Sequence, residues 1–171
     1  RHISIDSVNS SPSEINDKIL LEYSSEDLKS LMNVSDKIAE LNYSRFKNWE
    51  DPISSDNSRQ AVYAFKGDVY SGLDADSIKK DKFEYLQSSL RIISGYYGLL
   101  RPFDQILPYR LEMGTKLENN KGKNLYKFWG DKITDILNSD LDSKDVVVNL
   151  ASEEYFKSIN CLLYTSPSPR D

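Results

Sequence analysis

The stretch LRIISGYYGLLRPFDQILPYRLEMGTKLENNKGKNLYKFWGD, residues 90–131, differs in kind from the sequence around it. It mixes glycine and proline with aromatic residues and arginines, including Tyr96, Arg101 and Tyr109. Gly95 and Gly98 predict a sharp local path and a close approach of another part of the backbone. We therefore expect this stretch to decide how the chain folds.

The same stretch is the basic part of an acidic chain. The 171 residues carry a net charge of −5, yet residues 90–133 hold 8 basic and 4 acidic side chains, net +4. A local positive field of this kind can steer an anionic partner towards the protein. The alternative is a solvated lysine-rich face without a ligand, and the charge pattern alone leaves both interpretations open.

Composition excludes several classes of chemistry. The hydrophobic share of 39% and charged share of 29% are typical of one soluble globular domain. One cysteine, Cys161, rules out an internal disulfide and a cysteine-rich zinc site. One histidine, His2, leaves no credible base for a serine or cysteine nucleophile. We therefore expect no cofactor and no bound metal. We also expect no membrane span, since no run of about 18 apolar residues occurs.

Hydrophobic periodicity predicts an α/β fold with a mixed sheet and surrounding helices. Serines at 11, 24 or 25, and 35 are suited to cap the first three helices, and the second and third helices form a hairpin. Ile38, Leu41 and Phe46 are expected to face inward. Further helices are expected at 81–90, 123–137 and 153–159, with Gly130 at a tight packing contact in the longest. Strands are expected at 61–65, 109–113 and 145–150, and residues 91–94 fit a strand or a helix continuation.

The arginines of the basic stretch are the best candidates for binding an anion. Arg101 and Arg110 carry planar guanidinium groups that suit bidentate contact with phosphate. Ion pairs with Asp104 or Glu112 are the structural alternative. Three lysines gather just before the expected long helix, where free N–H groups also favour an anion: Lys116, Lys121 and Lys123.

Two weaker candidates complete the set. Asp68 and Asp131 could hold a metal or act as acid and base in an enzyme, although their spacing is not typical of ligands. The helical hairpin could instead grip a DNA backbone, flanked by Lys37, Arg45 and Lys47. The link at 33–36 lacks the glycine expected of such a hairpin, and its aspartate would repel phosphate.

Several segments, taken in order, resemble the peroxide stress protein YaaA family. They are NVSDKIAELNYSRFKNW at 33–49, AFKGDVYSGL at 64–73, residues 90–119 of the basic stretch, NLYKFWGDKIT at 124–134 and VVNLASEEYFKSI at 147–159. The resemblance runs from about residue 14 to residue 159. The family usually continues at both ends, so we expect this chain to be a fragment. Residues 1–160 are interpreted as one partial YaaA-like domain and residues 161–171 as a tail of non-native origin.

The resemblance implies a function and a set of binding residues. It implies a cytoplasmic bacterial protein that limits oxidative damage during hydrogen peroxide stress and lowers free iron. It implies a YaaA-like fold with an N-terminal helix-hairpin-helix element, a basic cleft, and binding of double-stranded or distorted DNA without established catalysis. Glu40 departs from the pattern near the second hairpin helix. By motif position and charge, the cleft residues carried over are Lys66, Arg101, Arg110, Lys116 and Lys123.

Overall fold

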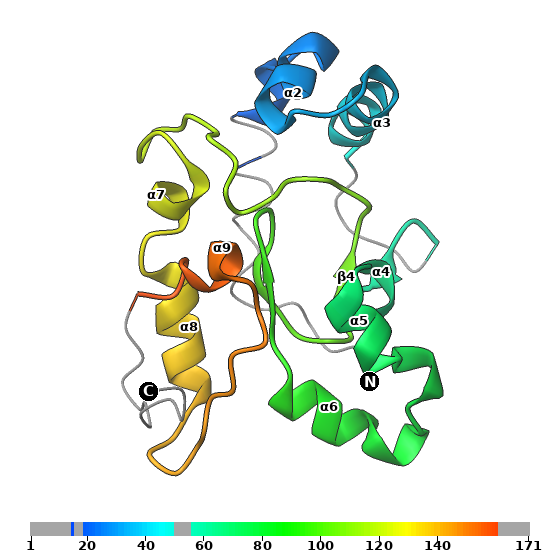
Figure 1. The fold of residues 1–171 in the computed structure, drawn as a ribbon, viewed down its shortest axis with the longest axis vertical. Coiled ribbons are helices and arrows are strands. Elements are labelled where there is room, and N and C mark those ends of the chain that lie inside the picture. The colour runs from blue at the N-terminus through cyan, green and yellow to red at the C-terminus, as the bar shows by residue number, and fades with distance from the viewer. Residues whose placement is uncertain (1–14, 16–18, 50–55, 161–171) are drawn as a thin grey trace.

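The computed structural model describes residues 15, 19–49 and 56–160, and within them the fold is mixed α/β (Figure 1). The expected class is confirmed, although the described strands form two separate two-stranded antiparallel sheets and no larger mixed sheet. The elements in chain order are η1 (Leu20–Glu22), α2 (Ser25–Met32), α3 (Asp36–Lys47), β1 (Arg59–Gln60), α4 (Ala61–Ala64), α5 (Asp68–Leu73), η2 (Ala75–Ser77), η3 (Lys80–Lys82), α6 (Phe83–Ser89), β2 (Ile92–Ser94), β3 (Gly98–Leu100), β4 (Gln105–Ile106), α7 (Leu125–Trp129), α8 (Lys132–Asp140) and α9 (Glu153–Phe156).

The helices are spread around the hairpin that β2 and β3 form. Helices α2 and α3 lie at one end of the long axis, and α6 lies at the other end (Figure 1). Helices α7 and α8 line one side, while α4 and α5 line the opposite side (Figure 1). No helix among the described residues is long and apolar enough to cross a bilayer.

The β2–β3 hairpin is locked by two glycines and a tryptophan. A Cβ on Gly95 would lie 2.5 Å from the carbonyl oxygen of Leu111, and a Cβ on Gly98 would lie 2.7 Å from the Trp129 ring. Gly98 also has a φ of +77°, a conformation that L side chains rarely adopt. The Trp129 indole N–H donates to the carbonyl oxygen of Gly95 at 2.9 Å. The expected close backbone approach is therefore confirmed.

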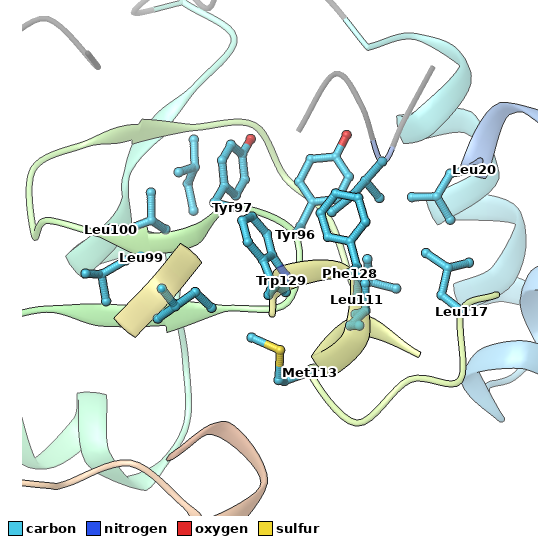
Figure 2. Close-up of a cluster of buried hydrophobic side chains, with 14 of the residues drawn as sticks. Leu20, Tyr96, Tyr97, Leu99, Leu100, Leu111, Met113, Leu117, Phe128 and Trp129 are labelled. Atoms are coloured by element: carbon cyan, nitrogen blue, oxygen red, sulfur yellow. The ribbon is translucent and has the colours of Figure 1, made fainter. Parts of the chain in front are cut away.

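The hydrophobic core forms around this lock. Figure 2 shows Tyr96, Phe128 and Trp129 side by side with leucines that come from distant parts of the chain. The largest side chains with less than 2% exposure are Trp129, Tyr96, Phe46, Phe128, Ile15, Leu20, Leu28, Met113, Leu117, Leu125 and Ile133. Most of these side chains belong to residues 90–133 or contact those residues. The stretch at 90–131 therefore organises the fold, as expected.

The N-terminal helical pair follows its capping signals. Helix α2 begins after Ser24, whose hydroxyl accepts from the Asp27 N–H at 3.2 Å, while the Asp27 carboxylate accepts from the Ser24 N–H at 2.9 Å. Helix α3 begins after Ser35, as expected. The expected inward face is only partly right, because Phe46 is buried whereas Ile38 and Leu41 are 37% and 48% exposed.

The strand expected at 61–65 and the single long helix expected at 123–137 are not found. Residues 61–64 form the helical turn α4. The N–H groups of Ala61 and Val62 donate to the carbonyl oxygens of Asp104 and Pro102, and the Phe65 N–H donates to the carbonyl oxygen of Ala61, which closes the turn. The long helix expected at 123–137 is divided into α7 and α8 at Gly130, whose φ is +52°. A Cβ on Gly130 would meet nothing within 4 Å, so backbone conformation explains this glycine, and tight packing does not.

The other two expected strands are not strands either. Residues 109–113 keep the predicted alternation, with Leu111 and Met113 buried and Arg110 and Glu112 exposed, but they lie in no sheet. Residues 145–150 also lie in no sheet and are largely exposed. The helices expected at 81–90 and 153–159 are confirmed in shorter form as α6 and α9, and of the two alternatives left for residues 91–94 the structure has the strand, β2. The helix start at Ser11 and the tail 161–171 fall outside the described residues.

Candidate functional site: a cleft beside helix α6

The hairpin register brings two arginines to one end of the hairpin. Ile92 pairs with Leu100 in the β2–β3 ladder, so Arg91 and Arg101 flank its open end. A cleft of about 740 Å³ lies beside them, bordered by α6, by the turn after β3 and by the end of α8. Its lining residues are Gln60, Phe83, Glu84, Gln87, Ser88, Arg91, Arg101, Phe103 and Asp140.

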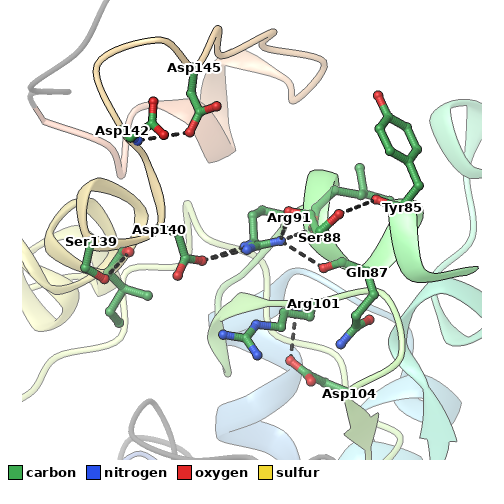
Figure 3. Close-up of polar contacts among 12 residues, drawn as sticks. Tyr85, Gln87, Ser88, Arg91, Arg101, Asp104, Ser139, Asp140, Asp142 and Asp145 are labelled. Atoms are coloured by element: carbon green, nitrogen blue, oxygen red, sulfur yellow. Dashed lines mark hydrogen bonds and ion pairs between the residues drawn. The ribbon is translucent and has the colours of Figure 1, made fainter.

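Arg91 forms one wall of the cleft and is held from two directions (Figure 3). Its Nε and Nη2 atoms bond to the Asp140 carboxylate at 2.8 and 2.7 Å. Its Nη1 atom donates to the carbonyl oxygens of Gln87, Ser88 and Leu90 at 2.8–3.2 Å. The last carbonyls of a helix have no intrahelical donor, so Arg91 satisfies the end of α6 and ties it to α8. Its role is therefore structural.

Arg101 is exposed at the cleft, and its guanidinium group is not held in this way. Its backbone N–H donates to the Asp104 carboxylate at 2.7 Å (Figure 3). Its side chain makes no ion pair within 4 Å in the part of the chain that the structure describes. Burial raises the pKa of Asp104, against the smaller lowering effects of the Arg101 N–H bond and of the positive charges of Arg101 and Arg91. The guanidinium of Arg101 is consequently available to an anion from outside.

The inner part of the cleft combines aromatic rings with an unsatisfied donor. The Phe83 and Phe103 rings lie 5.0 Å apart between centroids. The Gln87 side-chain oxygen accepts from the Phe103 N–H at 3.0 Å, while its buried amide nitrogen has no partner among the described residues. Leaving a buried donor unsatisfied costs about 1–3 kcal/mol. Flat groups such as nucleobases suit the aromatic part of the cleft because they can stack on rings.

The other predicted DNA-binding residues are distributed over several elements. Lys37, Arg45 and Lys47 belong to α3, at the end of the molecule opposite α6 (Figure 1). Lys47 is already engaged, since its Nζ donates to the carbonyl oxygen of Leu21 at 2.6 Å and lies 5.5 Å from the Tyr43 ring centroid. The structure therefore does not bring the α3 cations together with Arg101.

The cations of the basic stretch differ in how freely they are exposed. Arg110 pairs with Glu112 at 2.6 Å, so the structural alternative for this arginine is confirmed. Lys121 lies 4.4 Å from the Phe128 ring centroid and donates to the Phe128 carbonyl oxygen at 3.4 Å. Three predicted lysines are exposed and make no ion pair among the described residues: Lys66, Lys116 and Lys123.

The carboxylates proposed for an enzyme do not form a pair. Asp68 lies at the start of α5, and Asp131 directly precedes α8, where it accepts from the Asn160 side-chain amide at 2.6 Å. Helices α5 and α8 lie on opposite sides of the hairpin (Figure 1). Among the described residues, no three His, Cys, Asp or Glu side chains are grouped to hold a metal. The structure therefore does not bring Asp68 and Asp131 together, and an enzyme built on them stays a prediction.

Sequence reasoning missed most of the cleft. Arg101 was expected at a binding site, but Arg91, Gln87 and Phe83 were not. The signal for Arg91 was its position just after a helical segment, where a cation can bond to the last carbonyl oxygens. Gln87 carried no such signal, because its partner Phe103 is 16 residues away and reaches it only in the folded chain.

Comparison with known proteins gives a consistent family assignment. A family model described as "Peroxide stress protein YaaA" matches residues 6–167. A UPF0246 protein of Shewanella baltica (strain OS155) is 59% identical over 135 residues, which cover 78% of this chain and 53% of the relative. A UPF0246 protein of Marinomonas sp. (strain MWYL1) is 54% identical over 145 residues, 85% of this chain and 56% of the relative. The chain thus spans about half the length of the relatives it matches.

Proposed function

Because this chain belongs to the peroxide stress protein YaaA family, we propose that it acts as a DNA-binding protein in the cytoplasmic response to hydrogen peroxide. In this proposal it limits oxidative damage to DNA and lowers free iron. Its partner is double-stranded or distorted DNA, and the contact is made mainly with the phosphate backbone.

The observation that carries the DNA-binding proposal is the free guanidinium of Arg101 beside an aromatic cleft. Arg101 directly follows β3, and the ion pair of Arg91 with Asp140 forms part of the cleft wall beside it. A guanidinium group suits bidentate contact with phosphate. In distorted DNA, an unstacked base would lie against the Phe83 and Phe103 rings next to that phosphate.

Additional contacts come from exposed lysines, with smaller effects. Lys66, Lys116 and Lys123 would each neutralise one phosphate. The α2–α3 pair, as a DNA-gripping helix-hairpin-helix element, stays a prediction. Asp36 and Glu40 are exposed there and would repel phosphate, so we expect Lys37 and Arg45 to contribute less than Arg101.

Salt dependence of duplex binding tests the proposal. Affinity for a fluorescent duplex, with and without a central mismatched bubble, is measured by anisotropy across a salt series. The unmodified chain should lose affinity steeply as salt rises. Arg101→Ala should weaken binding on all sequences and reduce the logarithmic salt slope by about 1. Lys144→Ala removes one exposed charge outside the predicted site and serves as the matched control.

Three results would contradict the proposal: affinity that does not change with salt, Arg101→Ala binding like the unmodified chain, or Lys144→Ala weakening it equally. The peroxide role is tested separately in bacteria that lack their own family member. Expression of the full-length protein should lower free iron and mutation frequency under hydrogen peroxide. If free iron stays unchanged, the iron part of the proposal fails while DNA binding can still be judged by anisotropy.

A further inference from the structure

Two opposite charges line the cleft beside α6 and do not pair with each other. Glu84 lies on α6, and Arg101 directly follows β3 on another wall of the cleft. The exposed Glu84 carboxylate makes no hydrogen bond or ion pair with any residue that the structure describes. A carboxylate at this position repels phosphate, so contact with the DNA backbone alone does not account for it.

The face of α6 that carries Glu84 is turned toward the segment that carries Arg101. Glu84, Gln87 and Ser88 all line the cleft, and they follow the i, i+3, i+4 spacing of one helix face. The Gln87 side-chain oxygen accepts from the N–H of Phe103, two residues after Arg101 (Figure 3). A ligand in the cleft therefore lies between a face with an acceptor and a segment with a cation.

Two aromatic rings complete the cleft. Phe83 directly precedes Glu84 and Phe103 follows Arg101 closely, so each of the two walls supplies one ring and one charged group. The two ring centroids lie 5.0 Å apart. The cleft volume of about 740 Å³ lies within the roughly 300–1,000 Å³ of pockets for small ligands. One nucleotide has the matching size and the matching set of groups: a flat base, an anion and hydrogen-bond donors.

The unpaired carboxylate decides which base fits. We propose that the cleft selects guanine, with the base against the two rings, its Watson–Crick edge on Glu84 and its phosphate on Arg101. A carboxylate only accepts hydrogen bonds. Guanine offers it two adjacent donors, N1–H and N2–H, whereas adenine and cytosine place an acceptor nitrogen beside their amino group. Thymine has one N–H between two carbonyl oxygens. Where the guanine is an unpaired base in DNA, this inference rests on the proposed function.

Duplexes with one unpaired nucleotide at the centre test the inference. Anisotropy at fixed salt measures affinity for a fully paired duplex and for duplexes that bulge a single guanine or a single thymine. The unmodified chain should bind the guanine bulge about tenfold more tightly than the thymine bulge. Glu84→Gln should abolish this preference, because it replaces an acceptor oxygen with a donor amide. It should keep or raise affinity for the paired duplex, because it removes a negative charge.

A matched variant and free nucleotides separate the possible results. Glu153→Gln removes an exposed carboxylate of α9, outside the cleft, and should keep the guanine preference. Equal affinity of the unmodified chain for the two bulges overturns the inference, as does a preference that survives in Glu84→Gln. The fully paired duplex reports the proposed DNA binding separately. In calorimetry, a chain that binds deoxyguanosine monophosphate better than thymidine monophosphate but binds no duplex would support the guanine site and contradict the proposed function.

Discussion

The β2–β3 hairpin and the segment 145–150 are both short, apolar and rich in strand-forming residues, yet they have opposite fates. In the hairpin, Ile92 and Leu100 face each other in the ladder and are 4% exposed. In the segment, Val146 and Val148 are more than 70% exposed, and no strand lies beside them among the described residues. The β-propensity of a stretch therefore allows it to form a strand, but whether it does so depends on a neighbouring strand.

The hairpin is also the part that connects the fold to the proposed function. It carries Arg91 and Arg101 on either side of its open end, one holding the cleft wall and one facing an incoming anion. Damage to the hairpin should therefore affect both stability and binding. Damage to the segment 145–150 should affect neither in this chain.

The largest effect is expected from breaking the hairpin lock. Gly98→Ala forces a Cβ to within 2.7 Å of the Trp129 ring at a φ of +77°, so we expect a loss of about 2–4 kcal/mol in the free energy of unfolding. Gly72→Ala in α5 is the control, because a Cβ there meets nothing within 4 Å. It should be neutral or stabilise by about 0.5–1 kcal/mol. Urea unfolding measures both, and a Gly98→Ala variant as stable as the unmodified chain would refute the lock.

A matched pair of substitutions compares the two regions directly. Ile92→Thr places a hydroxyl in the core and removes apolar contact, with an expected loss of about 2 kcal/mol. Val148→Thr changes an exposed side chain and should stay within about 0.5 kcal/mol of the unmodified chain. The same unfolding assay checks both. Comparable losses at the two positions would mean that the segment 145–150 is buried in solution.

A smaller effect on stability is expected at alkaline pH. It concerns the packing around the hairpin and not the segment 145–150, because that segment contains no tyrosine. Burial raises the pKa of Tyr70 to about 12, and burial raises the pKa of Tyr97 and of Tyr109 as well. The folded state thus disfavours the tyrosinate, so this contribution to stability is complete below pH 10 and is lost as pH rises through 12.

Ultraviolet absorbance of tyrosinate, followed together with unfolding, checks this prediction. We expect part of the tyrosine signal to appear only as the protein unfolds above pH 10. If all tyrosines titrate near pH 10 while the fold stays intact, the packing around Tyr97 and Tyr109 is not as described.

The sequence predicted those features that depend on neighbouring residues. The Ser24 cap, the close approach at Gly95 and Gly98, and the alternating burial at 109–113 follow from local chemistry. The helical turn at 61–64 was missed because a short apolar run fits helix and strand equally. The break at Gly130 was missed because a single glycine can also lie inside a helix. At the cleft, Arg101 was predicted from its own chemistry, whereas Gln87 depended on a contact made across the fold.

Hydrogen exchange on the 171-residue chain alone tests the central claim most directly, namely that the hairpin is complete while the segment 145–150 pairs with no described strand. Backbone amides within 92–100 that bond in the ladder should exchange at least about a hundredfold more slowly than their intrinsic rates. Amides at 146–150 should exchange close to their intrinsic rates, because they donate to no described group. Comparable protection of the two segments at low protein concentration would contradict the account.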